Sequence, residues 1–406
     1  MIHEKHKTRA ASLLLSGVLP ILLLCIGAKA PEGRERAPGY DFRQADALIE
    51  AGIARKELPG AVLVVGHGGR VVYRRAYGDR AVVPDVEPMT VDTVFDMASL
   101  TKPLVTALAA AQLIEQHRLE LDRPVAAYWP AFGANGKQAV TVRELLTHYS
   151  GLPPDLDLSP AWTGKLEGFR RAAEIGLATT PGTVFRYSDI NFIALQAVIE
   201  RITGEPLESY AQERIFKPLH LQHSRFLPPP SWKGRIAPTE YDTNGGPQSY
   251  GTMLRGVVHD PTARRMGGVA GHAGLFMTAG DLAVYAQALL NRRSGRSSRF
   301  SLDRATLLRI TMPEQPAGGK DLRGLGWDID SPYSGNRGAV FPIGSFGHTG
   351  FTGTSIWLDP ASDTYVILLA NAVHPHAGHN ITHLRGEVAT AVAKALGASA
   401  AAVPAR

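Results

Sequence analysis

The feature that most limits how this 406-residue chain can fold is the order of its patterns: strand patterns lie near both ends, and a long helical stretch lies between them. Residues 60–78, GAVLVVGHGGRVVYRRAYG, are typical of two strands around a glycine turn, and a helical pattern over 42–53 precedes them. Residues 347–371 again have strong strand character, and a final helix is expected over 384–396. We therefore expect both ends of the chain to form one antiparallel sheet with the terminal helices on one face.

The middle of the chain has helical patterns joined by loops. Residues 228–274 are rich in Pro and Gly and lack periodicity, which indicates a functional loop that shapes a pocket. The predicted fold class is α+β, with an α/β part at about 40–98 and 305–398 and a helical part at about 99–304. Within the helical part, four helices are expected over 102–116, 141–148, 188–204 and 278–291.

The first thirty residues have the pattern of an export signal. A basic head, MIHEKHKTR, precedes the apolar run AASLLLSGVLPILLLCIGA, and AKA supplies small residues for a signal peptidase. Pro31 would hinder cleavage directly after AKA, so Ala28 is an equally good end. The alternative is a retained membrane anchor, since the run approaches the ~20 residues that a span needs. We expect a signal peptide at 1–30, a linker at 31–39 and an exported, periplasmic or extracellular domain at 40–398.

Composition narrows the function classes. Hydrophobic residues make up 44% and charged residues 20%, which is typical of a globular protein. Without residues 1–30 the formal net charge falls from +6 to +3 (39 basic against 36 acidic residues), so nucleic acid is not an expected partner. The single cysteine, Cys25, lies in the signal segment, so the remaining chain would have neither a disulfide nor a cysteine nucleophile.

A serine and a lysine three residues apart, Ser99 and Lys102, stand at the start of the first long helix. At this spacing Lys102 can reach the Ser99 hydroxyl and, if neutral, take its proton. Lowering the lysine pKa from ~10.4 toward 7 costs the charged form about 4–5 kcal/mol of solvation, which burial between two domains can supply. The alternative is a capping serine followed by a solvated lysine. Pro103 and the strand-like TVFDMA favour a nucleophile at a helix start, where free N–H groups suit an oxyanion.

The segment FRYSDIN supplies a second candidate group. Tyr187 stands just before a helix that Ser188 or Asp189 caps, and the helix dipole there favours a phenolate by ~0.3–1 kcal/mol. Such a tyrosine could pass protons between a serine and a leaving group. The alternative is a tyrosine packed at a helix entrance.

The segment GHTGFTGTSIWLDP supplies a third. A strand with His348, Thr349 and Gly350 gives a ligand an edge to pair with, and the glycine lets its backbone come close. The Phe351 N–H would then be a second oxyanion donor beside that of Ser99. On its own, this segment is a plain glycine-containing strand.

Two further signals are weaker. NAVHPHAGHNITH holds four histidines (His374, His376, His379 and His383), and the last two have the i, i+4 spacing of zinc ligands. A solvated loop is the simpler interpretation, and we expect neither a metal nor a cofactor. GGVAGHAG lacks the spacing of a phosphate-binding loop, and its His272 could face the cleft or be structural.

The three motifs, S-L-T-K at 99–102, Y-S-D at 187–189 and H-T-G at 348–350, resemble those of the serine β-lactamase and penicillin-binding protein superfamily. The resemblance is strongest to its class C-like, esterase-like branch. It continues in TVRELLTHYSGLP, GGVAGHAGLFMTAGDLAVYAQALL and LLANAVHP, and it covers about 40–398. It implies a β-lactamase/transpeptidase-like fold with its active site in the cleft between the two parts.

The resemblance also implies roles for the residues. Ser99 would be acylated, Lys102 and Tyr187 would share the proton transfers, and the N–H groups of Ser99 and Phe351 would hold the oxyanion until water releases the acyl group. Asp189, Asn191 and His272 are expected in a second layer around these groups.

Two residues depart from the family pattern. Asp189 stands where Asn is common, and a carboxylate beside Lys102 would favour the charged lysine by one to three pKa units. Either Tyr187 carries more of the base role, or Asp189 turns away to cap its helix. His348 stands where many relatives have lysine, so a substrate carboxylate should be held less strongly. Both changes count against an efficient β-lactamase.

The sequence therefore predicts an exported serine hydrolase that forms an acyl-enzyme on Ser99. Its expected substrates are small molecules or peptides, cleaved by esterase, D-amino-acid peptidase, carboxypeptidase or weak β-lactamase activity. The alternative is a catalytically silent relative that binds cell-wall peptides or a protein partner. No membrane contact is expected beyond the N-terminal segment.

Overall fold

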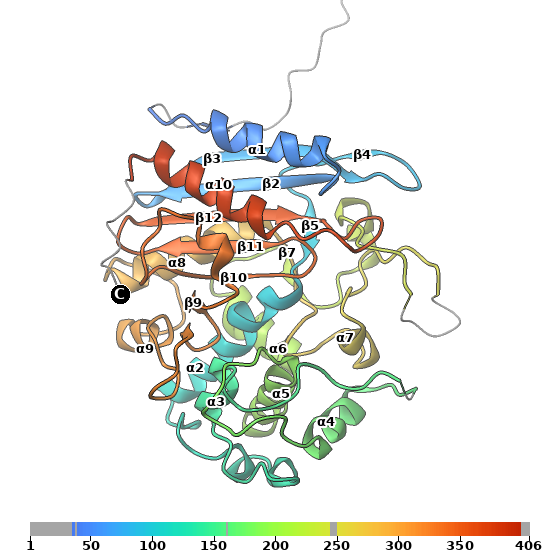
Figure 1. Ribbon diagram of the computed structural model, residues 1–406, viewed down its shortest axis with the longest axis vertical. Helices are drawn as coiled ribbons and strands as arrows, with labels where there is room; N and C mark the ends of the chain where they lie inside the picture. The colour runs from blue at the N-terminus through green and yellow to red at the C-terminus, as the bar shows by residue number, and fades with distance from the viewer. Residues whose placement is uncertain (1–34, 37–38, 160, 244–249, 399–406) are drawn as a thin grey trace, which may run out of the picture. The chain divides into compact units, whose positions relative to one another are not determined.

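The computed structural model describes residues 35–36, 39–159, 161–243 and 250–398 (Figure 1). The predicted signal peptide, its cysteine and most of the predicted linker lie outside the described residues. Among the described residues, none of the helices combines the length and the apolar character that crossing a membrane would need.

A large antiparallel sheet joins the two ends of the chain, as the strand patterns predicted. The strand order is β1-β3-β2-β12-β11-β10-β9-β8, with β4 pairing to β3. The ends meet where β2 pairs with β12, in a register that sets Val64 opposite Ile367. The strands are β1 (Glu35–Arg36), β2 (Gly60–His67), β3 (Arg70–Ala81), β4 (Glu87–Pro88), β8 (Leu322–Arg323), β9 (Asp328–Asp330), β10 (Phe346–Thr349), β11 (Ser355–Asp359) and β12 (Thr364–Ala370).

Both faces of the sheet are buried, because successive side chains of β2 point to opposite sides. Leu63 and Val65 belong to a core that includes residues of α1 (Arg43–Ala54) and α10 (Thr382–Ala395), and these two helices pack against each other. Val62 and Val64 belong to a second core that α8 (Ala279–Arg293) shares. Helix α8 contacts β2 and β12, so this helix packs on the sheet although the predicted helical part, 99–304, includes it.

The middle of the chain forms the helical part, whose central helix is α5 (Asp189–Thr203) (Figure 1). All residues of α5 from Ile190 to Ile199 are buried, and the helix ends at Gly204 in the left-handed conformation. The single helix expected over 102–116 is instead a π-helical segment, η2 (Lys102–Ala107), followed by α2 (Leu108–Glu115). The other helices are α3 (Val142–Thr147), α4 (Lys165–Glu174), α6 (Leu207–Ala211), η5 (Gln212–Phe216), α7 (Pro261–Arg265) and α9 (Arg304–Ile310).

Short elements complete the described chain. A small sheet has the order β5-β7-β6 and consists of β5 (Val94–Asp96), β7 (Phe276–Thr278) and β6 (Ser224–Arg225). Strand β5 leads directly into the segment that carries Ser99. The short 3-10 helices are η1 (Ala98–Leu100), η3 (Val125–Ala127), η4 (Pro130–Gly133), η6 (Pro230–Arg235) and η7 (Ser334–Arg337).

Candidate active site

Ser99 lies in the tight turn between strand β5 and the π-helical segment η2. The preceding residue, Ala98, has a φ of 45°, a left-handed conformation that a non-glycine residue adopts only when its surroundings hold it there. Asp96 provides part of that hold, because its Oδ1 accepts a hydrogen bond of 2.9 Å from the Ala98 N–H. π-helical turns are rare in proteins, and those that occur are often found at functional sites. The π-helical segment η2 begins at Lys102.

Lys102 is fully buried and directs its ammonium at Ser99. Its Nζ donates to Ser99 Oγ at 2.8 Å and to the His272 carbonyl at 3.2 Å, and lies 2.6 Å from Asp189 Oδ1. Burial alone would lower the lysine pKa, but Asp189 and Tyr187 act against it and the pKa is raised above its ordinary value. Lys102 is therefore charged in the free protein.

Asp189 takes the first of the two orientations that the sequence left open for it. Its carboxylate pairs with Lys102 and does not turn away to cap α5. Ser188 is the N-cap residue of α5, but its hydroxyl donates to the Pro153 carbonyl at 2.5 Å and caps nothing. The expected cap by either side chain is thus wrong, because each has a stronger partner outside the helix.

Tyr187 stands between Lys102 and a stack of aromatic rings. Lys102 Nζ lies 4.9 Å from the centre of the Tyr187 ring, and the His148 ring stacks on the Tyr187 ring with their centres 4.3 Å apart. Burial raises the pKa of the Tyr187 phenol, and this outweighs the lowering by Lys102 and Ser99. The tyrosine is therefore protonated in the free protein, and the dipole of α5 does not make it a phenolate.

The strand of the third motif, β10, runs beside the Ser99 turn. A Cβ added at Gly350 would lie 2.5 Å from the Met97 carbonyl and 2.2 Å from Thr354 Oγ1, so only glycine lets the strand come this close. The Phe351 side chain is 69% exposed, and its ring stacks on that of His259 at 5.5 Å. Glycine is thus required at position 350 because the backbone there packs closely against Met97, in the chain segment before Ser99.

His348 on β10 is buried and neutral. Burial, then Arg323 and Lys102, hold its pKa well below the ordinary value of histidine. Its Nδ1 lies 2.8 Å from the Thr349 carbonyl. At this position the protein therefore has no positive charge, where a lysine would have one.

A cleft of about 450 Å³ opens at Ser99. Tyr187, His348, Thr349, Gly350 and Phe351 line it together with Ser99, so the three motifs meet at one cavity. The remaining wall was not predicted: it comes from Asp328, Tyr333, Val373, Arg385 and residues 378–382. The described residues of 228–274, a segment expected to shape the pocket, are not among those that line this cleft, and Asp260 and His272 of that segment lie instead near Lys102 and Asp189.

The comparisons with known proteins agree with this geometry. Residues 45–390 match the family model described as Beta-lactamase. This chain belongs to the β-lactamase family. It is 34% identical over 370 residues to a Bacillus subtilis (strain 168) protein named N-acetylmuramyl-L-alanine amidase, covering 82% of this chain and 81% of the relative. It is 31% identical over 350 residues to an Escherichia coli (strain K12) protein named "Putative D-alanyl-D-alanine carboxypeptidase", covering 78% and 79%.

Solved structures confirm the fold. A penicillin-binding protein homologue from Caulobacter crescentus superposes with a TM-score of 0.70 at 21% identity, covering 89% of this chain and 98% of the other. A homologue from Pyrococcus abyssi, described as octameric, gives a TM-score of 0.67 at 23% identity, covering 88% and 78%. The predicted α+β, β-lactamase/transpeptidase-like fold is confirmed, and the protein is a serine hydrolase of the β-lactamase family.

His148 is a residue of this β-lactamase-family site that the sequence analysis did not single out. Asn191, expected in the second layer around the catalytic groups, contacts it: the two side chains approach to 3.1 Å, and Asn191 also accepts a 2.5 Å bond from Ser150. Asn191 thus holds the ring that stacks on Tyr187. The signal for His148 was its place as the last residue of the helix pattern TVRELLTH, where its left-handed φ of 62° ends α3.

The four histidines of NAVHPHAGHNITH do not assemble into one site. His374 is buried and accepts a bond from the Val82 N–H at 3.0 Å, whereas His383 lies 3.4 Å from Glu57. His379 lines the Ser99 cleft, and the His376 ring packs against Tyr241. The zinc arrangement considered for His379 and His383 is therefore not formed.

Proposed function

We propose that Ser99 attacks the carbonyl carbon of an ester or amide and forms an acyl-enzyme that water then hydrolyses. The observation that carries this proposal is the 2.8 Å bond between Ser99 Oγ and the fully buried Lys102 ammonium, at the floor of a cleft that the other two motifs line. A buried cation beside a serine at a strained turn has no evident structural task.

The protonation states of Lys102 and Tyr187 set the first condition for catalysis. Lys102 is charged and Tyr187 is protonated in the free protein, so the pair must lose one proton before it can accept that of Ser99. The apparent pKa of that loss belongs to the pair and not to either residue. As Oγ bonds to the carbonyl carbon, its proton moves to this pair and is then donated to the leaving amine or alkoxide.

The developing oxyanion needs donors on the far side of the cleft. In the proposal these are the backbone N–H groups of Ser99 and Phe351, on the two segments that Gly350 brings together. Donors fixed before the reaction stabilise the intermediate without reorganising, and removing one typically costs ~10²–10³ in kcat.

We propose an acidic cell-wall peptide fragment as the substrate. The names of two relatives, N-acetylmuramyl-L-alanine amidase and "Putative D-alanyl-D-alanine carboxypeptidase", support a substrate with an amide bond to alanine. The cleft wall includes the Arg385 guanidinium, which donates to the carbonyls of Gly350 (2.8 Å) and Thr354 (3.1 Å). Burial lowers its pKa to about 10, and within the described part of the chain it forms no ion pair, so an anionic group of a substrate suits it.

Hydrolysis assays with four substrates would test this assignment. We expect the wild-type protein to cleave a muramyl-L-alanine amide or a D-alanyl-D-alanine peptide faster than a p-nitrophenyl ester or a chromogenic cephalosporin. The Ser99→Ala variant should cleave none of them. Turnover by Ser99→Ala equal to that of wild type would contradict the nucleophile, and preference for the cephalosporin would contradict the substrate class.

We further propose that the protein is exported. The N-terminal pattern over residues 1–30 and a substrate from the cell wall support this proposal. Intact mass measurement of the protein from a periplasmic fraction should show a chain that begins after Ala28 or Ala30. A chain with an intact N-terminus in the membrane fraction would favour the retained anchor.

The ion pair of Lys102 with Asp189 favours a second candidate function, in which the protein binds cell-wall peptides without catalysing a reaction. A lysine held charged at 2.6 Å from a carboxylate is a poor base. If no probe forms an acyl-enzyme but muropeptides bind reversibly, this second function replaces the first.

A further inference from the structure

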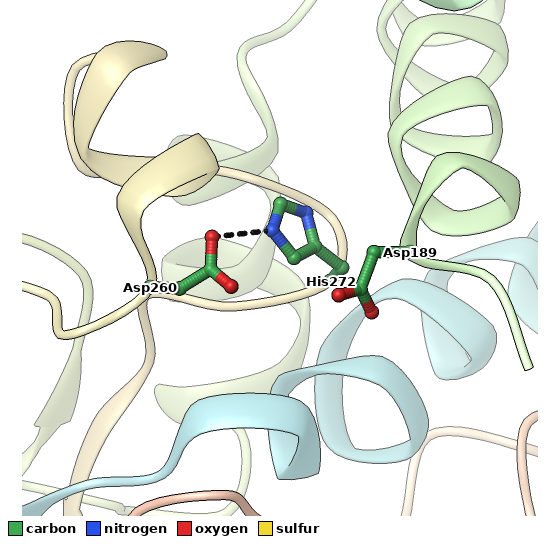
Figure 2. A group of neighbouring side chains, drawn as sticks. All are labelled: Asp189, Asp260 and His272. Atoms are coloured by element: carbon green, nitrogen blue, oxygen red, sulfur yellow. Dashed lines mark hydrogen bonds and ion pairs between the residues drawn. The ribbon is translucent and has the colours of Figure 1, made fainter. Parts of the chain in front are cut away.

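His272, Asp189 and Asp260 form a cluster of charged groups next to Lys102, and none of the three is among the described residues that line the Ser99 cleft (Figure 2). Asp189 begins α5, Asp260 is the N-cap residue of α7, and His272 lies just before β7. One donor or acceptor atom from each of the three lies within 4.8 Å of the other two. Three segments distant in the sequence thus place ionisable groups next to the proposed base.

His272 lies between the two carboxylates. Its Nε2 is 2.8 Å from Asp260 Oδ1, and Figure 2 shows Asp189 on the other side of the ring. Two carboxylates this close repel unless a cation accompanies them. Asp260 and Asp189 raise the pKa of His272 despite the opposing effect of its burial, so the two carboxylates favour the cationic form of the ring.

Two ion pairs connect the cluster to Lys102 when His272 is protonated. Lys102 pairs with Asp189 at 2.6 Å and His272 pairs with Asp260, which gives two cations and two anions in alternation. The His272 backbone also takes part, because its carbonyl accepts a 3.2 Å bond from Lys102. The cluster is therefore an array of ion pairs that ends on the proposed base.

We propose that His272 is a positioning residue. Its positive charge offsets the negative charge of Asp189 and so allows the Lys102–Tyr187 pair to lose a proton. The inference rests on the proposed function of Ser99. The negative charge of Asp189 raises the apparent pKa of the Lys102–Tyr187 pair, whereas a cation next to Asp189 lowers it. This arrangement explains how a chain with Asp189 beside Lys102 can still activate a serine.

Four groups face His272 and enter its pH dependence: Asp260, Asp189, Lys102 and Asp155. Asp155 accepts bonds of 3.0 and 3.1 Å from Thr262, and burial, then Asp260 and Asp189, raise its pKa to about 6. Asp155 is thus ionised above pH ~6 and adds to the negative charge that holds His272 protonated.

The test is the pH profile of kcat/KM for an amide substrate in the His272→Gln variant. Loss of the positive charge should move the acid limb upward by about one pH unit and lower the rate at pH 7 about tenfold. His272→Lys, which keeps a cation, should return the limb toward its wild-type position. An acid limb in His272→Gln at the same pH as in the wild-type protein would overturn the proposal.

Two controls separate this proposal from a structural role and from the proposed function. His67→Gln changes a histidine at the end of β2 that contacts Thr364, and it should leave the profile unchanged. If His272→Gln does not fold, the ¹⁵N spectrum of the wild-type protein decides, because a neutral His272 ring at pH 6.5 overturns the proposal. If Ser99→Ala keeps full activity, the proposed function fails, whereas an active Ser99 with an unmoved limb makes only this inference fail.

Discussion

His272 and His348 flank the same serine–lysine pair and both are buried, but the charges around His272 favour a cationic ring whereas His348 is neutral. The carboxylates of Asp260 and Asp189 raise the pKa of His272, whereas Arg323 and Lys102 add to burial and lower that of His348. Burial alone would leave both rings neutral. The neighbouring charges therefore decide which of the two buried rings favours the cationic form and which stays neutral.

The two buried lysines make the same contrast. Lys102 has Asp189 as partner and its pKa is raised, whereas Lys137 donates only to carbonyl oxygens, those of Ala134 and Ala173 among them, and burial lowers its pKa. Both are completely shielded from solvent. The groups around a buried lysine thus decide the direction of its pKa shift: a carboxylate partner raises the pKa of Lys102, whereas burial among carbonyl oxygens lowers that of Lys137.

Replacing these lysines should produce the largest difference. Lys102→Met removes the group that accepts the Ser99 proton, so kcat/KM should fall by at least ~10³-fold. The matched Lys137→Met change leaves carbonyls without a donor and should lower the free energy of unfolding by about 1–3 kcal/mol, with kcat kept within twofold. Steady-state kinetics and urea unfolding measure both. Equal losses of activity in the two variants would contradict the distinction.

Tyr187→Phe should have the next largest effect. The ring and its stacking on His148 are kept, and only the hydroxyl that shares the proton with Lys102 is lost. We expect kcat to fall by ~10²–10⁴-fold with KM little changed. A variant with more than half of the wild-type kcat would show that Lys102 alone moves the protons.

Asp189→Asn should move the pH profile opposite to His272→Gln. Removing the carboxylate at 2.6 Å from Lys102 makes the protonated Lys102–Tyr187 pair less stable, so the apparent pKa of the pair falls. The acid limb of kcat/KM should move down by about one pH unit. An upward shift would mean that Asp189 activates the pair in some other way.

His348→Gln should have the smallest effect on the pH profile. Because the ring is neutral, its removal takes no charge from the site, and the acid limb should stay in place. KM should rise a few-fold, since the side chain lines the cleft. A shift of the limb by half a pH unit or more would show that His348 is charged after all.

Much of this arrangement could be predicted from the sequence, because local patterns carry it. The strand patterns at both ends predicted the sheet that joins β2 to β12, and the three motifs that met at the cleft each have a local signature. The orientation of Asp189 could not be predicted, because capping and pairing with Lys102 are both compatible with YSDIN. Its outcome depends on the distance to a residue 87 positions away in the chain.

Asp189 and His272 are expected near the catalytic groups from the sequence, but Asp260 and the outer cleft wall had no signal that the sequence analysis used. Asp260 precedes a proline and caps a five-residue helix, which is an ordinary loop feature until His272 is found beside it. Arg385 lies on the C-terminal helix, where an arginine usually faces solvent. Only the packing of α10 against the sheet places this arginine at the Ser99 cleft.

Covalent labelling with a fluorophosphonate, followed by peptide mass spectrometry, tests the central claim most directly. We predict one adduct, on Ser99, that is absent from Ser99→Ala and present in Ser188→Ala, whose hydroxyl bonds to the Pro153 carbonyl. An adduct that persists in Ser99→Ala, or that lies on another residue of the wild-type protein, would contradict the account.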